Sequence, residues 1–415
     1  MGRSGGGARR PLSASRGRRR PSFAAAFGLV VLLMGSGAAD GEAQWYGSAA
    51  FETRAFPESG LFDDQARMGL SVSVRPQYDR FFDDGSQLSF EGFARLDQRD
   101  GNRTHVDLRV LSWEKAWDRW EARVGFRTVF WGVTESNHLV DVINQTDLVE
   151  DPDGEQKLGQ PMINVAWIQD FGTFDLFVMP VFRERTFPGS DGRLRFPLAV
   201  DSDGSTFGAG AGRATFDWSV RWSHYFGPLD VGVSHFNGVS REPLLRLTQG
   251  EDGPPALTPH YDRIHQTGLD VQATLGGWLL KLETIRRTGQ GPAFVAATGG
   301  FEYTVVGTLG TPADLGLIAE YLYDERGRGT APFADDVFLG ARLALNDVQS
   351  TSLLAGFIID THSGSTLFRV EGERRVGQDW TVDLRGVAFQ GLSNQDPLYG
   401  FRRDGYLQLE LARHF

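Results

Sequence analysis

The sequence predicts an all-β fold, namely a transmembrane antiparallel up-and-down β-barrel of about 18 strands, with about 16 strands as the alternative. Three observations lead to this prediction. From Trp45 onward, segments of about ten to thirteen residues alternate between apolar and polar side chains. Short and long connections separate these segments in turn, and the chain ends on one such segment, whose last residue is Phe415. A period of two is the pattern of a strand with two unlike faces.

The final segment is the clearest example of this alternation. One frame of every second residue is apolar apart from Arg413 and holds Leu407, Leu409, Leu411 and Phe415. The frame between these positions is mostly polar. A strand that ends a chain on an aromatic residue resembles the closing strand of bacterial outer-membrane β-barrels. The resemblance implies that Phe415 is the signal read by the barrel-assembly machinery.

The same pattern recurs along the chain. It is clear at 68–75, 88–97, 121–130, 337–346 and 380–388. In total, about 18 segments are predicted, which begin near residues 45, 66, 86, 104, 119, 161, 173, 214, 229, 264, 278, 299, 314, 336, 350, 365, 379 and 404.

The connections between these segments fall into two alternating groups. Those of the first group are short, at 115–118, 170–173, 226–228, 276–277, 346–349 and 376–378. Those of the second group are mostly longer, at 132–160, 185–213, 239–263, 289–298, 326–335 and 391–403, with 99–103 and 361–364 tight. Short periplasmic turns and long extracellular loops are the arrangement of membrane barrels. An even number of strands then places the start of the first strand and the end of the last strand on the periplasmic side.

Aromatic residues support a membrane barrel over soluble β-rich folds. Trp117, Trp120, Phe226, Trp278 and Trp380 fall at or beside the expected periplasmic turns, as in an interfacial girdle. A β-propeller or a β-sandwich would also contain many short alternating strands. However, the second face here repeatedly carries Arg, Asp and Glu, which favours water inside and lipid outside.

The N-terminus predicts an export signal over residues 1–43. Seven arginines precede a twelve-residue apolar core from Phe23 to Met34, and small residues follow. Cleavage is expected after Ala39 or Ala43, with export by the general secretory route. The apolar core is too short for a transmembrane helix, which needs roughly 20 residues. Residues 44–415 are expected to form a single barrel domain.

Composition excludes several classes of function. The chain has 415 residues and no cysteine, which removes disulfides, thiolate metal sites and cysteine nucleophiles. Beyond residue 43 it holds 35 basic and 51 acidic residues, a formal net charge of −16. A chain this acidic does not fit a nucleic-acid binder, because phosphate contacts need a basic surface.

About 18 strands enclose a lumen wide enough for an aqueous channel. Arginines that are expected to face this lumen gather in the first seven strands. They are Arg75, Arg95, Arg109, Arg123, Arg127 and Arg183.

Residues 132–160, which we call the acidic loop, are predicted to narrow the lumen. The loop follows the fifth strand, and its position resembles that of the third extracellular loop of the general porins, which folds into the barrel. Facing the arginines, its acids would set up a transverse field that selects ions and orients dipolar solutes. The alternative is a solvated surface loop. The predicted constriction consists of Glu135, Asp141, Asn144, Asp147, Glu150 and Asp151 from the loop, with Arg75, Arg95, Arg109, Arg123 and Arg127 from the wall.

The most specific resemblance lies in the same region. Trp131-Gly132, Asp141-Val-Ile-Asn144 and Asp147-Leu148, preceded by Asp107-Leu-Arg109, resemble a family of porin-like outer-membrane proteins of unassigned function. The match covers roughly residues 104–150, and beyond it only the strand pattern agrees. The resemblance implies solute transport without naming a substrate.

The residues of this motif also suggest local roles. Asp141 and Asn144 are expected to cap backbone turns. Asp147 is expected to pair with a lumen arginine such as Arg109 or Arg127.

No catalytic, cofactor or metal site is predicted. The single G-x-S-x-G match, Gly2 to Gly6, falls inside the leader, and zinc-protease and phosphate-loop motifs are absent from the sequence. Asp151-Pro-Asp153-Gly154 and Asp201-Ser-Asp203-Gly204 hint at calcium loops, but neither has the full spacing, and plain turns are preferred. The sequence therefore predicts that the protein is not an enzyme.

We expect an outer-membrane channel for passive diffusion of small hydrophilic solutes or ions, selected by size and charge. A first alternative is a transporter of hydrophobic compounds or lipids with a plugged lumen. Phe93, Phe177, Met179, Phe357 and Phe389, on the nominally inward frame, keep it open. A second alternative is a structural or adhesive barrel.

The expected partners follow from this reading. They are outer-membrane lipid and lipopolysaccharide, the barrel-assembly machinery and small solutes, and not nucleic acid. A homotrimer is one arrangement that the sequence leaves open.

Overall fold

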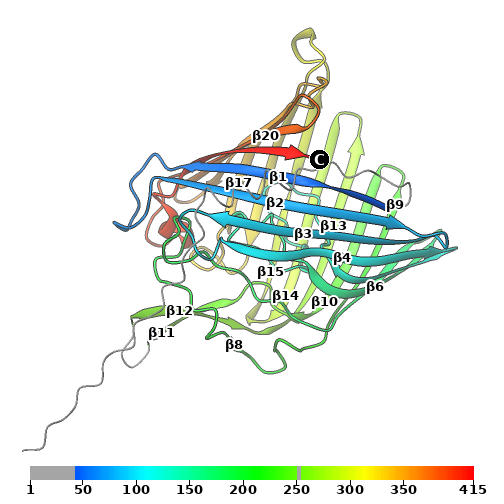
Figure 1. Cartoon of the computed structure of the whole chain (residues 1–415), viewed down its shortest axis with the longest axis horizontal. Coiled ribbons are helices and arrows are strands. Elements are labelled where there is room, and N and C mark those ends of the chain that lie inside the picture. The colour runs from blue at the N-terminus through cyan, green and yellow to red at the C-terminus, as the bar shows by residue number, and fades with distance from the viewer. Residues whose placement is uncertain (1–42, 250–253) are drawn as a thin grey trace, which may run out of the picture.

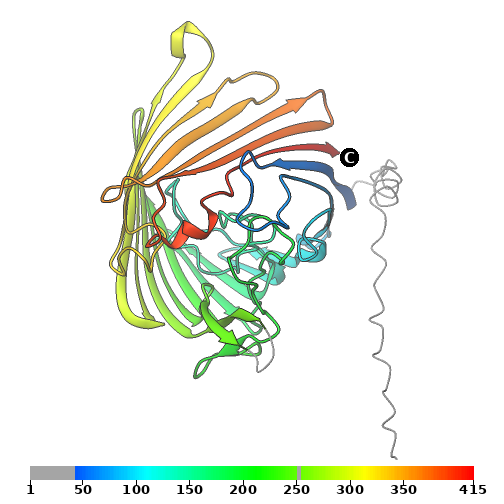
Figure 2. The same ribbon diagram turned by 90° about the vertical axis from the view of Figure 1, so that its left-hand side faces the viewer.

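The protein is a closed barrel of eighteen antiparallel strands, as seen in a computed structural model that describes residues 43–249 and 254–415 (Figures 1 and 2). The closed ring of eighteen strands confirms the predicted fold class and strand number. The leader predicted over residues 1–43 lies, apart from Ala43, outside the described residues.

The first and last strands close the barrel. Strand β1 (Ala43–Ala55) pairs with β2 (Met68–Phe81) on one side and with β21 (Tyr406–His414) on the other, and Figure 1 shows the red β21 beside the blue β1. Just beyond β21, the backbone N–H groups of Phe415 and Gly47 each donate to the other residue's carbonyl oxygen, at 3.1 and 3.0 Å. The sheet therefore has no free edge between its first and last strands.

The remaining barrel strands each pair with their neighbours in chain order. They are β3 (Ser86–Asp97), β4 (His105–Trp117), β5 (Trp120–Arg127), β6 (Gln160–Gln169), β7 (Gly172–Met179), β9 (Asp217–Phe226), β10 (Leu229–Val239), β13 (Arg263–Leu275), β14 (Trp278–Gly289), β15 (Gly291–Val305), β16 (Asp314–Asp324), β17 (Asp335–Ala344), β18 (Ser352–Asp360), β19 (Thr366–Val376) and β20 (Trp380–Gln390).

One predicted long connection is wrong. Residues 289–298 were expected to form a loop, but β14 ends at Gly289 and β15 begins at Gly291. Both glycines have positive φ, 104° and 78°, which permits the tight reversal. The alternation of the following residues is hidden in the sequence, because apolar side chains occupy both frames. Phe294 is buried inside the barrel, whereas Val295 lies on its exposed outer face.

Two predicted loops contain further structure. Strand β8 (Thr206–Phe207) lies in one of them, and β11 (Leu244–Gln249) and β12 (Pro255–Tyr261) form a hairpin in the other. Together they form a separate three-stranded sheet at the end of the barrel that carries the long connections (Figure 1). The described residues also contain two short 3-10 helices, η1 (Thr308–Gly310) and η2 (Pro397–Phe401). None of the described helices is long and apolar enough to cross a membrane.

The predicted frames agree with the faces of the barrel. In β21, Tyr406 and Gln408 are buried inside, whereas Leu407, Leu409 and Leu411 are exposed outside. The five aromatic residues predicted at the short turns are all exposed at the end of the barrel that carries those turns, namely Trp117, Trp120, Phe226, Trp278 and Trp380.

Phe357 is a second correction. It was assigned to the inward frame, but it is 47% exposed on the outer face, where its ring packs against that of Phe368. Ile358, beside it, is the buried residue. Both frames of β18 are apolar, so alternation alone does not show which one faces the lumen.

A buried charge network braces the inner wall near the junction of the barrel ends. Glu52 on β1 is 2% exposed and accepts hydrogen bonds from Arg95 at 3.0 Å and Arg103 at 2.7 Å. Arg54 lies 3.3 Å from the same carboxylate. Neither Glu52 nor Arg103 was predicted from the sequence. The alternation of β1 specifies the face of Glu52 but not its partner, and Arg103 lies in the connection after β3, where no alternation applies.

We expect Glu52→Gln to destabilise the barrel by about 3–5 kcal/mol, because it removes the carboxylate shared by three buried guanidinium groups. Glu150 and Asp97 remain as the only acidic partners of Arg95 and Arg103 within 3 Å among the described residues. The measurement is urea unfolding in lipid vesicles. Glu91→Gln is the control, since Glu91 pairs with the half-exposed Arg75 at 3.6 Å and is expected to cost at most about 1 kcal/mol. Equal effects of the two substitutions would contradict the role given to Glu52.

Candidate functional site

The acidic loop lies inside the barrel. Its residues contact inward-facing side chains on β3 and on β14, which lies eight strands further round the ring of eighteen. Figure 2 shows the green and cyan connecting segments within the curve of the wall. The loop therefore crosses the interior.

Glu283 on β14 is the first anchor of the loop. This carboxylate is fully buried and accepts backbone N–H groups of Val133, Thr134 and Val140 at 2.7, 3.0 and 3.1 Å. The Thr134 hydroxyl donates to it at 2.8 Å. Hydrogen bonds to an ionised acceptor are stronger than neutral ones, so a single wall residue holds one whole turn of the loop.

Glu320 on β16 is the second anchor. It accepts the backbone N–H groups of Glu135 and Ser136 at 2.7 and 2.9 Å, and the Ser136 hydroxyl at 2.6 Å. Neither anchor was predicted from the sequence. The available signal for Glu320 was an acid between the apolar Ile318 and Leu322 in one frame of β16.

Asn144 fixes the base of the loop. Its amide oxygen accepts from Val129 N at 2.8 Å, and its amide nitrogen donates to the carbonyl oxygens of Arg127 and Leu158, both at 2.8 Å. Asp141 accepts the weaker N–H contact of Trp131 at 3.4 Å. Both side chains thus bind local backbone, as the motif suggested.

The acidic residues of the loop that were predicted to form the constriction each form an ion pair. Asp147 pairs with Arg109, as expected for one of its two candidate partners. The other pairs are Glu150 with Arg95 at 2.9 Å, Asp141 with Lys157 at 3.1 Å, Glu135 with Lys281 at 3.6 Å and with Arg342, and Asp151 with Arg385. Asp141 and Lys157 both belong to the loop, whereas the other pairs hold the loop against the wall. A transverse field of these acids across the lumen stays a prediction.

Other predicted arginines lie away from the loop acids. Arg75 faces Glu91, and Arg123 pairs with Glu114 at 2.9 Å. Arg127 donates to Asn164 at 3.3 Å. Arg183, just beyond β7, pairs with Asp107 at 2.6 Å. A direct role of these side chains in a constriction stays a prediction.

The loop also has an apolar side. Val140, Val142 and Ile143 are buried against inward-facing residues that include Phe236 and Ile264. This packing fills the part of the interior beside β6 to β15, and it covers the predicted inward residues Phe177 and Met179.

His138 links the loop to its anchor. Its ring nitrogens lie 3.4 Å from Glu155 and 3.9 Å from Glu283. Burial by itself lowers the pKa of His138, but the two carboxylates outweigh it and raise the pKa to about 10. The imidazole is therefore a cation at neutral pH.

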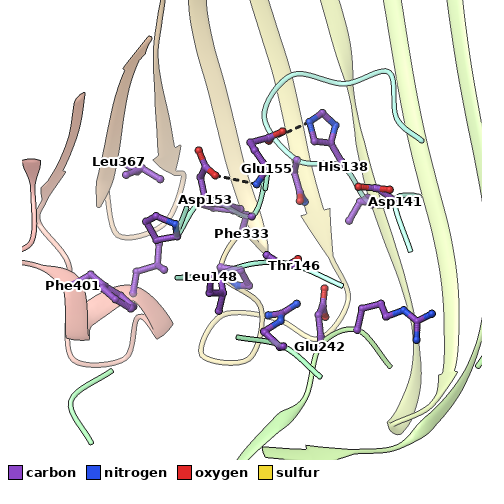
Figure 3. Close-up of a pocket in the computed structure, with 18 of the residues that line it drawn as sticks. His138, Asp141, Thr146, Leu148, Asp153, Glu155, Glu242, Phe333, Leu367 and Phe401 are labelled. Atoms are coloured by element: carbon purple, nitrogen blue, oxygen red, sulfur yellow. Dashed lines mark hydrogen bonds and ion pairs between the residues drawn. The ribbon is translucent and has the colours of Figure 1, made fainter. Parts of the chain in front are cut away.

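A cavity of about 550 Å³ lies between the loop, the inner wall and the long connections. Figure 3 shows Leu367 and Phe401 on one side of it and His138 and Asp141 on the other. Within the described residues, no group of three or more His, Asp or Glu side chains is arranged to hold a metal ion.

No family model matches the sequence, and no curated protein matches it. Three solved barrels are similar in structure. Wzi of Escherichia coli, described as an outer-membrane protein involved in group 1 capsule assembly and a carbohydrate-binding β-barrel, has a TM-score of 0.52 at 9% identity, over 90% of this chain and 84% of Wzi. A BenF-like porin from Pseudomonas fluorescens Pf-5 has a TM-score of 0.52 at 9% identity, over 90% and 97% of the two chains. OccK11 (OpdR) of Pseudomonas aeruginosa has a TM-score of 0.50 at 10% identity, over 90% and 95%. At these identities the likeness concerns the fold.

We expect Glu283→Gln to loosen the first turn of the loop, because it removes the charged acceptor of four hydrogen bonds. Amide hydrogen exchange at residues 133–140 should become about tenfold faster or more, equivalent to about 1.4 kcal/mol. The control is Glu373→Gln on β19, a lumen-facing carboxylate for which no hydrogen bond from the loop is found among the described residues. Unchanged protection in Glu283→Gln would show that the loop is held by other contacts.

The charge of His138 has a testable pH dependence. Because its pKa is raised in the folded state, the stabilisation from its ion pairs is fully present below about 6.5 and is lost as the pH rises through about 10. NMR of histidine-labelled protein should therefore show a protonated His138 ring at pH 8, and Glu155→Gln should lower its titration midpoint. A wild-type midpoint near 6.5 would contradict the geometry.

Proposed function

We propose that this protein is a porin-like channel of the bacterial outer membrane that passes small hydrophilic solutes or ions by passive diffusion. The observation that carries the proposal is a loop folded inside a closed eighteen-stranded barrel and fastened to both sides of the wall. A barrel of this size encloses more space than its wall side chains fill. The loop therefore narrows a water-filled passage and does not close it. The fold shared with a BenF-like porin supports the same reading.

Selection by charge is proposed to depend on lumen residues outside the loop. Glu373 on β19, Asp383 on β20 and Glu410 on β21 lie directly opposite one another in the strand register, and Glu410 lies opposite Glu52 on β1. Like charges on directly opposite positions are destabilising. Exposure to water reduces this cost at Glu373, and Arg95, at 3.9 Å, reduces it at Glu410. Because the loop acids are already paired, the row is the stronger source of an electric field in the lumen.

The hydrophobic-cargo alternative has lost most of its support. Phe177 and Met179 pack beneath the loop, and Phe357 faces outward. The Phe93 ring has the guanidinium groups of Arg75, Arg95 and Arg109 within 5.0 to 5.7 Å of its centre. Phe389 alone among the five lines the cavity. An exit for lipid would need an apolar path that these residues do not provide.

The proposed location has further requirements. We propose that the chain is exported by the general secretory route and inserted by the barrel-assembly machinery. Its exposed outer face then contacts lipid and lipopolysaccharide, with the aromatic residues of the short turns at the periplasmic interface.

The channel is tested by conductance in planar bilayers under a salt gradient. The protein should give discrete openings, and replacing residues 133–157 by a short Gly-Ser linker should enlarge them, because the linker no longer crosses the lumen. Combined Glu373→Gln and Asp383→Asn should shift the reversal potential, whereas Glu325→Gln, at the barrel rim, should not. Absence of discrete conductance from correctly folded protein would contradict the proposed function.

A further inference from the structure

We infer that the cavity at the long-loop end is a binding site for a small organic anion with an apolar body, such as an aromatic carboxylate. This inference rests on the proposed function, because the site would bind one class of the solutes that pass through the same channel. It depends on the shape, the apolar wall and the unbalanced charges of the cavity.

The cavity has the size and wall of a ligand site. Its volume of about 550 Å³ falls within the range of small-molecule pockets. Apolar side chains come together there from separate parts of the chain, namely Phe187 and Phe333 from long connections, Leu367 and Phe389 from β19 and β20, and Phe401 from η2. Phe333, Leu367 and Phe401 are visible in Figure 3. Such a wall favours a solute with an apolar part over a fully hydrated ion.

The charges around the cavity favour an anion. Seven cationic side chains line it against five acidic ones, with His138 counted as charged. Several of them neutralise one another, as Arg287 and Glu242 do at 2.9 Å and Arg326 and Asp324 do at 2.6 Å. Arg241 is paired at 3.0 Å with Asp217, which lies outside the cavity. Among the described residues, the lining cations left without an ion pair are Arg185 and Arg369.

Arg369 on β19 is the first of these cations. Its Nε is buried and has no hydrogen-bond partner, and no ion pair of Arg369 is found among the described residues. The charges of Asp153, Glu155 and Glu371 act on it from a distance, and burial raises the pKa of Asp153, which makes that carboxyl group a weaker counter-charge. A partly buried guanidinium without an ion-pair partner is costly, so an anion in the cavity would stabilise it.

Arg185, in the connection after β7, is the second. Its Nε donates to Gln145 at 3.2 Å, and within the described part of the chain it forms no ion pair. Burial lowers the pKa of Arg185, and the more distant Glu242 offsets only part of that cost. A guanidinium presents paired N–H donors that match a carboxylate. Arg185 and Arg369 therefore offer two places at which a carboxylate can bind at the edge of the apolar wall.

The test is isothermal titration of the detergent-purified, folded protein with 3-phenylpropionate. Two matched compounds separate the contributions: 3-phenylpropan-1-ol lacks the charge, and propionate lacks the aromatic body. We expect saturable binding of 3-phenylpropionate. Each of the other two compounds should bind at least about tenfold more weakly. No binding of 3-phenylpropionate, or equal binding of the alcohol, would overturn the inference. Equal binding of propionate would overturn the role of the apolar wall.

Variants locate the site. Arg369→Gln should weaken 3-phenylpropionate binding about tenfold or more, whereas Arg375→Gln, at the exposed short-turn end of the same strand, should leave it unchanged. Arg185→Gln gives the same test if Arg369→Gln fails to fold. Binding that neither variant weakens would place the ligand elsewhere and overturn the inference.

Conductance separates the two proposals. Protein that conducts ions but does not bind 3-phenylpropionate would overturn only the anion site. Protein that binds 3-phenylpropionate but shows no conductance would overturn the channel and leave the site standing.

Discussion

The buried carboxylate of Glu283 is the contact on which the interior of this barrel depends. It accepts three backbone N–H groups and one hydroxyl of the acidic loop, and it lies 3.9 Å from His138. Each side needs the other, because an unpaired carboxylate and unpaired N–H groups are both costly inside a protein. The turn at residues 133–140 is therefore held at mid-barrel, and the apolar packing of Val140 and the cavity beyond it follow from that position.

Charge is used for two different purposes in the interior. Where the loop touches the wall, pairs such as Arg95 with Glu150 exclude water and act as fasteners. Where the loop is absent, carboxylates such as Glu373 and Asp383 face each other across neighbouring strands and need water to do so. The same residue types thus hold the loop in one region and shape the lumen in another. The distinction depends on burial, which composition does not reveal.

Particular residues show how far sequence reasoning reached. The strand starts were predicted to within three residues except that of β15, where small apolar residues in both frames hid the alternation. The pairing of Asp147 with Arg109 was anticipated because both lie in one motif. The partners of Glu283 and Glu320 were not anticipated, since about 150 and 185 residues separate them from the loop residues that they bind.

The sequence by itself determined that this chain is a barrel, because alternation with a period of two and the succession of short and long connections are local properties. It also determined which face of most strands meets water. Only the tertiary structure decided which carboxylate meets which cation, and hence that the loop acids are fasteners while Arg185 and Arg369 keep unbalanced charge. The reason is geometric: closing the sheet brings inward-facing side chains from distant strands together, and no spacing along the chain encodes those distances.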